Sequence, residues 1–127
     1  MRILLDTQIF LWFITNNDRL ASRLAGLIRD PANQVFLSSV SVWETIVKYQ
    51  LGKLPLPESP ETLIPTQRNL HRFETLSLDE ASATRLVSLP RLHRDPFDRM
   101  LICQALEHGL VLATVDDEVR AYPVSTV

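Results

Sequence analysis

Four acidic residues, far apart in the chain, could act together on a single ligand. Each lies where an apolar, strand-like run has just ended or a helical pattern has just begun. In a parallel sheet such junctions meet at one edge, so we expect the four carboxylates to share that edge. The four residues are Asp6, Glu44, Asp98 and Asp116.

Four carboxylates in one place repel each other unless a positive charge compensates them. The simplest compensation is a hard divalent cation, because Mg²⁺ and Mn²⁺ prefer oxygen ligands. Mg²⁺ usually takes only one or two carboxylates directly, which would leave the other acids to support the site. A metal held in this way can polarise a phosphoryl oxygen and activate a bound water for attack on a phosphodiester. The same four acids are therefore the candidate metal-binding and catalytic residues of a nuclease that needs no nucleophilic side chain.

Each acid taken alone also has an ordinary structural explanation. Asp6, Asp98 and Asp116 could cap the N-terminus of a helix or complement its dipole. Glu44 could form an ion pair with Lys48, four residues later on the same helix. The matching position of all four acids favours the functional interpretation.

The segment from His93 to Ala105 organises the chain around one of these acids. Pro96 has a fixed φ and no N–H, so it suits the first turn of a helix. Apolar residues follow it at helical spacing, and Asp98 falls in the first turn, where the helix dipole favours a negative charge. Asp95, directly before the proline, could cap this helix or support the metal site as an outer carboxylate.

The residues around these acids each have two open roles. Arg94 and Arg99 could bind phosphate in a bidentate way, or they could pair with the neighbouring aspartates. His93 could contact RNA or act as a general acid, although a histidine satisfied by a backbone partner is the commoner arrangement. Trp43 and Phe97 could stack on bases, but their apolar neighbours favour packing in the core.

Length and composition describe an ordinary globular domain. The chain has 127 residues, of which 46% are hydrophobic and 22% charged, so we expect one domain over residues 1–127. Its formal net charge of −2 gives no overall basic character, although acids clustered at a metal would leave the remaining surface net positive. A single cysteine, Cys103, excludes an internal disulfide. No apolar run approaches the length of a membrane span, so we expect a cytoplasmic protein with no membrane partner.

Apolar runs alternate with helical patterns along the chain. This alternation is typical of an α/β fold with a mostly parallel central sheet of four to five strands and helices on both faces. Asp79 is expected to cap a helix that continues to Leu89, and Pro65 interrupts the helical pattern of residues 61–70. The expected strands are residues 2–5, 35–37, 73–78 and 110–113, with a short last strand at 124–127.

Several short motifs surround the four acids. They are Leu4-Leu5-Asp6-Thr7, Ser41-Val42-Trp43-Glu44 with Lys48, His93-Arg94-Asp95-Pro96-Phe97-Asp98-Arg99 before Gln104-Ala105, and Thr114-Val115-Asp116. Together these motifs resemble the PIN-domain ribonucleases of the VapC toxin type, which occur in bacterial toxin–antitoxin pairs. The resemblance extends over essentially the whole chain in the family's order and spacing. Gln8 and Cys103 depart from the commonest pattern, and neither removes an acid.

This resemblance implies a PIN-like three-layer fold and an endoribonuclease that uses Mg²⁺ or Mn²⁺. It puts the four acids on metal-binding positions and Thr114 on the hydroxyl position that often supports them. Thr7, Asp95 and Arg99 are the other candidate supporting residues. The resemblance also implies an RNA substrate, a cognate antitoxin protein and a homodimer. Two other classes stay open: a non-cleaving module that binds RNA or a partner protein, and a structure-specific DNA nuclease.

Overall fold

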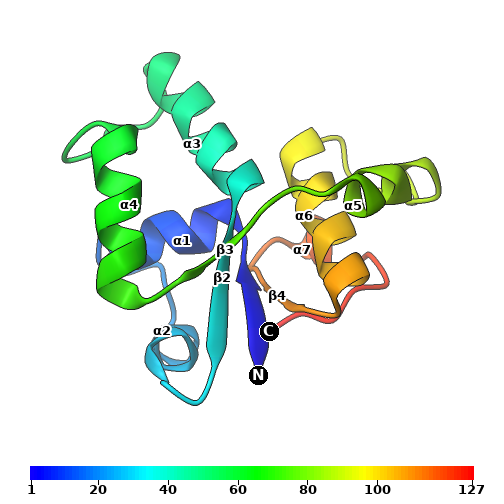
Figure 1. Cartoon of the computed structure of the whole chain (residues 1–127), viewed down its shortest axis with the longest axis horizontal. Coiled ribbons are helices and arrows are strands. Elements are labelled where there is room, and N and C mark those ends of the chain that lie inside the picture. Colours follow the sequence, from blue (N-terminus) through cyan, green and yellow to red (C-terminus); the bar gives the residue numbers. More distant parts are fainter.

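A four-stranded parallel sheet forms the centre of the protein, and the computed structural model describes all of its residues, 1–127 (Figure 1). The strand order is β3-β2-β1-β4, and all neighbouring strands pair in parallel. The predicted α/β class and parallel sheet are therefore confirmed. The strands are β1 (Arg2–Leu5), β2 (Gln34–Ser38), β3 (Glu74–Leu76) and β4 (Val111–Ala113).

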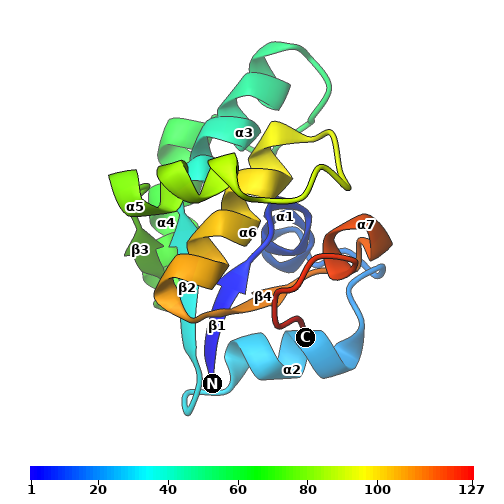
Figure 2. The same cartoon turned by 90° about the vertical axis from the view of Figure 1, so that its right-hand side faces the viewer.

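Helices cover both faces of this sheet and complete a three-layer arrangement (Figures 1 and 2). Helices α1, α2 and α4 lie on one face, and α5, α6 and α7 lie on the other (Figure 1). Helix α3 continues from β2 at the carboxyl edge of the sheet. The helices are α1 (Thr7–Ile14), α2 (Ser22–Arg29), α3 (Ser39–Gln50), α4 (Pro60–His71), α5 (Glu80–Thr84), α6 (Pro96–His108) and α7 (Asp117–Arg120), with a 3₁₀ turn at Arg85–Val87.

Alternating side chains of the strands fill two hydrophobic cores, one on each face of the sheet. In β1, Ile3 and Leu5 belong to the first core and Leu4 to the second. In β4, Ala113 belongs to the first core and Leu112 to the second. Since the central strands are apolar on both faces, they are stable only when helices cover both sides, which explains the three layers.

Four predicted elements are shorter in the structure than in the sequence pattern. The strands expected at residues 73–78 and 110–113 are Glu74–Leu76 and Val111–Ala113. The expected last strand at residues 124–127 makes only an isolated bridge between Thr126 and Leu112. At this bridge the Leu112 N–H donates to the Ser125 carbonyl (2.8 Å), and the Val127 N–H donates to the Leu112 carbonyl (3.0 Å). The helix expected from Asp79 to Leu89 is helical over Glu80–Thr84 and then tightens into the 3₁₀ turn.

The sheet has one point where the chain reverses its direction of strand addition. From β1 the chain adds β2 and β3 on one side, and it then crosses to add β4 on the other side of β1. Ligands of open α/β sheets bind at such a point, outside the carboxyl ends of the strands. The carboxyl ends of β1 and β4 are therefore the place to look for a functional site.

None of the helices combines the length and the apolar character that crossing a membrane would require.

Candidate metal centre

Asp6 follows β1 and begins α1. Its carboxylate accepts a hydrogen bond from the Ile9 N–H (2.7 Å), and its own N–H donates to the Ala113 carbonyl of β4 (3.1 Å). The residue is only 5% exposed. Burial raises the pKa of Asp6 to about 6, although hydrogen bonds from Thr114 and Ile9 act in the opposite direction. Asp6 is thus both a helix cap and a buried carboxylate at the crossover point of the sheet.

Glu44 enters the same region from α3. It is 3% exposed, and its Oε2 atom lies 2.5 Å from Lys48 Nζ. The ion pair that the sequence spacing suggested is therefore present. The other oxygen, Oε1, is buried and has no hydrogen-bond partner within the chain. A buried carboxylate oxygen without a partner is unfavourable, so Glu44 is only half satisfied by Lys48.

Asp95 and Asp98 stand together at the start of α6. Asp95 caps the helix by accepting hydrogen bonds from the N–H groups of Phe97 (2.8 Å) and Asp98 (3.1 Å). Burial, followed by the negative charge of Asp95, raises the pKa of Asp98 to about 6, while the hydrogen bond with His93 partly opposes this rise. The cap role expected for Asp95 is thus present, and its charge also acts on Asp98.

Asp116 follows β4 and begins α7. Its carboxylate accepts a hydrogen bond from the Glu118 N–H (2.9 Å). The Asp116 N–H donates in turn to the hydroxyl of Thr114 (3.1 Å), which is fully buried. Thr114 therefore fixes the backbone on which Asp116 is carried.

All four predicted acids line one cavity of about 200 Å³. Thr7 and Asp95 line it as well, and the Thr7 hydroxyl donates to the Ser41 hydroxyl (2.9 Å). Arg99 lies elsewhere, because its guanidinium donates to the Leu89 carbonyl (3.2 Å) and is not part of the cavity lining. The cavity is lined by Asp6, Thr7, Gln8, Leu11, Glu44, Lys48, Asp95, Asp98, Val115 and Asp116.

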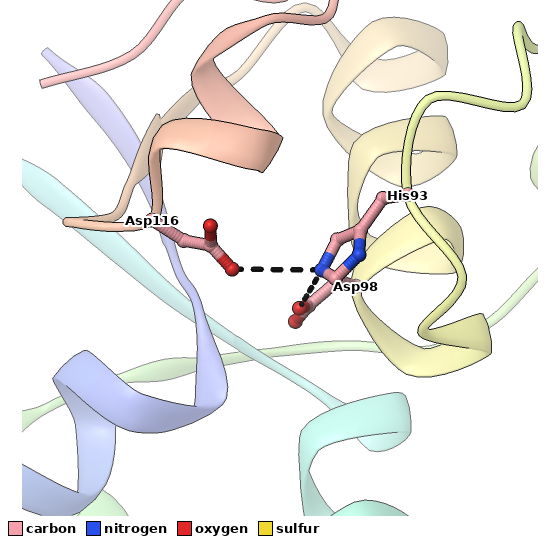
Figure 3. A group of neighbouring side chains, drawn as sticks. All are labelled: His93, Asp98 and Asp116. Carbon is pink, nitrogen blue, oxygen red and sulfur yellow. Dashed lines mark hydrogen bonds and ion pairs between the residues drawn. The ribbon is translucent and has the colours of Figure 1, made fainter.

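His93 lies at the centre of the acids on the α6 and α7 side (Figure 3). Its Nε2 atom lies 2.9 Å from Asp98 Oδ2 and 3.5 Å from Asp116 Oδ2, and its Nδ1 atom lies 2.8 Å from Glu118 Oε2. One ligand atom from each of His93, Asp98 and Asp116 can be chosen so that all lie within 4.8 Å of one another. The sequence leaves His93 as an RNA contact, a general acid or a histidine satisfied by a backbone partner. The structure shows the backbone partner, because Nδ1 accepts a hydrogen bond from the Arg94 N–H (3.0 Å), and the ring also contacts three carboxylates.

Lys48 and His93 face the acids. Burial alone would lower the pKa of His93, but the hydrogen bond and charge of Asp98, with the charges of Glu118 and Asp116, raise it. Burial would also lower the pKa of Lys48, and the contact with Glu44 raises it instead. These shifts indicate an excess of negative potential around the cavity.

These residues fit a hard divalent cation. The unpartnered Oε1 atom of Glu44 is a buried acceptor that a cation would satisfy. The oxygen-rich donor set is the kind that Mg²⁺ and Mn²⁺ prefer, and a cation among these carboxylates would relieve their mutual repulsion. The residues that line the cavity and could hold the ion directly are Asp6, Glu44, Asp98 and Asp116, with His93 beside them.

The fold and the site together define a class: a parallel α/β domain whose crossover point carries a cluster of carboxylates. Comparison with family models gives the particular family, because the PIN domain model matches residues 3–124. The chain belongs to the PIN domain family. The family resemblance expected from the sequence is thereby confirmed.

Curated relatives and solved structures agree with this assignment. Ribonuclease VapC22 of Mycobacterium tuberculosis is 26% identical over 125 residues, which cover 94% of this chain and 91% of that protein. Ribonuclease VapC16 of the same organism is 36% identical over 55 residues, which cover 43% of this chain and 39% of that protein.

Two crystal structures share the fold over all of this chain. VapBC2 from Rickettsia felis, bound to a DNA fragment from its promoter, matches with a TM-score of 0.74 at 18% identity and is covered over 98% of its matched chain. DNA-bound VapBC from Salmonella typhimurium matches with a TM-score of 0.70 at 19% identity, with 97% of its matched chain covered.

Proposed function

We propose that this protein is a Mg²⁺- or Mn²⁺-dependent endoribonuclease and the toxin of a toxin–antitoxin pair. The observation that supports the proposal most is the meeting of four acids from separate elements around one cavity, with one buried carboxylate oxygen left without a partner. Membership of the PIN domain family and similarity to two ribonucleases add independent support. We also propose that residues 1–127 act as a single domain and that the protein acts in the cytoplasm.

In this proposal Asp6, Glu44 and Asp98 hold the metal, and Asp116 is a further ligand or supports the others. When bound, the metal supplies Lewis-acid chemistry for hydrolysis of a phosphodiester by an activated water. Lys48 neutralises Glu44 in the metal-free protein, and its side chain is 44% exposed, so its ammonium can turn toward a substrate phosphate. His93 lies between Asp98 and Asp116 and orients their carboxylates.

Cleavage of a mixed RNA pool by the purified protein, with Mg²⁺, Mn²⁺ or EDTA, tests this proposal. We expect cleavage that requires metal and that disappears in Asp98→Asn. The matched control is Asp117→Asn, because the Asp117 side chain lies next to Asp116 in sequence but is 97% exposed. Cleavage that persists in EDTA or in Asp98→Asn would contradict the proposed site.

The same assay separates the two other classes of function. A single-stranded or hairpin DNA of the same sequence is offered at equal salt, because the chemistry at the phosphate does not distinguish the two nucleic acids. Cleavage of DNA in preference to RNA would indicate a DNA nuclease. Retention of RNA without cleavage, by folded protein free of antitoxin, would indicate a binding module.

The partners that we propose are an RNA substrate, a cognate antitoxin and a second copy of this chain. Solved structures of the same fold include toxin–antitoxin complexes, which supports the antitoxin. Exposed apolar side chains support a protein–protein contact: Trp43 is 60% exposed and Val87 is 93% exposed.

The expectation that Trp43 packs in the core is therefore wrong. The rings of Trp43 and Phe97 meet in a T-shaped arrangement, with centroids 4.8 Å apart.

A further inference from the structure

Tyr122 lies just beyond α7 and holds a distant part of the chain. Its side chain is buried, at 3% exposure, in the second hydrophobic core. Its hydroxyl accepts hydrogen bonds from two consecutive backbone N–H groups, those of Leu92 (3.0 Å) and His93 (2.9 Å). The contact therefore joins the end of the chain to the residue that lies among the acids.

The segment that carries His93 depends on such contacts for its shape. Residues 88–95 form no helix or strand, so no regular backbone pairing defines their course. Arg99 holds the beginning of this segment at the Leu89 carbonyl (3.2 Å), and Asp95 is held where α6 begins. Between these two points, Tyr122 holds the backbone at His93 from outside the segment, and within the segment the Arg94 N–H donates to His93 Nδ1 (3.0 Å).

The imidazole itself is held by the same C-terminal region. Asp116 lies 3.5 Å from Nε2, and Glu118 lies 2.8 Å from Nδ1. Tyr122 follows these two residues within a few positions of the chain and holds the His93 backbone (Figure 3 shows His93 and Asp116). The segment from Asp116 to Tyr122 thus contacts both the ring and the backbone of His93.

We propose that Tyr122 is a positioning residue, whose hydroxyl fixes the backbone of His93 and thereby keeps the imidazole between Asp98 and Asp116 at the metal centre. The proposal rests on the proposed metal-dependent function, but its first test needs neither metal nor RNA. Tyr122→Phe removes the hydroxyl and keeps the ring that packs in the core. Tyr49→Phe is the matched control, because it removes the hydroxyl of the chain's only other tyrosine, which is 37% exposed on α3.

The first measurement is amide hydrogen exchange of the metal-free protein. In Tyr122→Phe we expect the amides of Leu92 and His93 to exchange about tenfold faster, the scale set by loss of ordinary hydrogen bonds. The amides of β1 and α6 should not change, and Tyr49→Phe should resemble the wild type. Unchanged exchange at Leu92 and His93 would overturn the proposal, whether or not the protein proves to be a nuclease.

The second measurement is the affinity for Mn²⁺ by titration calorimetry. Tyr122→Phe should weaken Mn²⁺ binding by about tenfold, as is typical when a residue that orients a ligand is removed. In a His93→Gln background, Tyr122→Phe should cause no further loss, because its effect acts through His93. An equal loss in both backgrounds would show a merely structural role and would overturn the proposal. Failure of the nuclease proposal is recognised separately, by the absence of RNA cleavage in the wild-type protein.

Discussion

The two halves of the acidic site are built in different ways. Asp6 and Glu44 form a buried half, with exposed fractions of 5% and 3%. Asp98 and Asp116 form an open half with His93, and their side chains are 20% and 39% exposed. The buried half is carried by the end of β1 and by α3, whereas the open half also depends on the irregular segment before α6 and on contacts from α7.

The two halves therefore differ in how far solvent reaches their carboxylates. In the buried half, little water reaches the carboxylates, and burial raises the pKa of Asp6 to about 6. In the open half, solvent and His93 reach the carboxylates, although burial still raises the pKa of Asp98 to about 6. We expect substitutions in the buried half to have the larger effects on both metal-dependent activity and stability.

The largest effect is expected when the two halves are compared by cleavage. Asp6→Asn should lower kcat/KM for RNA by about a thousandfold or more, because it removes a buried charge from the metal centre. Asp116→Asn, at the more exposed end of the cavity, should lower it by roughly ten- to a hundredfold, the range for a residue that supports a metal ligand. Initial rates over a range of RNA concentrations give both values. Equal losses in the two variants would abolish the distinction between the halves.

The pH dependence of stability sharpens the comparison. The pKa of Asp6 is about 6 in the folded protein, above its value in an unfolded chain, so the folded state binds the extra proton. The stability of the metal-free protein should therefore fall as the pH rises from about 4 to 6, by about 2 kcal/mol from Asp6. Urea unfolding at several pH values in EDTA measures this.

Asp6→Asn is the control for that titration. Asparagine keeps an oxygen that can accept from the Ile9 N–H, but it carries no charge. The variant should lose about half of the decline between pH 4 and 6, because Asp98, whose pKa is also raised to about 6, keeps its own contribution. It should be more stable than the wild type at pH 7.5 in EDTA. A wild-type protein that becomes more stable over this interval would contradict the assigned direction of the Asp6 shift.

The sequence predicted the four acids better than the contacts of His93, for a physical reason. Asp6 directly follows an apolar run, and parallel topology determines where such a residue lies. Glu44 follows from helical spacing after the second strand. The contacts of His93 with Asp98, Asp116 and Glu118 need the folded positions of α6 and α7, and no local pattern encodes them.

Besides the contacts of His93, the sequence did not predict how exposed individual apolar side chains are. Trp43 has apolar neighbours at helical spacing, as a core residue does, yet it is 60% exposed. Helical periodicity defines an apolar stripe but not how much of it the neighbouring elements cover. The acids were easier to assign to a site, because a charged side chain is rarely buried unless it has a partner.

Lys48 gives the smallest of the expected effects and a direct test of how the buried half is balanced. Lys48→Met should lower the stability of the metal-free protein by about 1 kcal/mol, since the ammonium is 44% exposed and its pairing is partly screened. Lys53→Met is the control, because Lys53 is the chain's only other lysine and is exposed; this variant should change stability little.

The response to Mn²⁺ should also differ between Lys48→Met and the wild type. In Lys48→Met without metal, Glu44 has neither the lysine nor a metal ion beside it, so Mn²⁺ should raise the stability of this variant more than that of the wild type. Thermal unfolding with Mn²⁺ and with EDTA measures both quantities. An equal gain from Mn²⁺ in the two proteins would mean that Lys48 and the metal do not share Glu44, and Glu44 would then be excluded as a metal ligand.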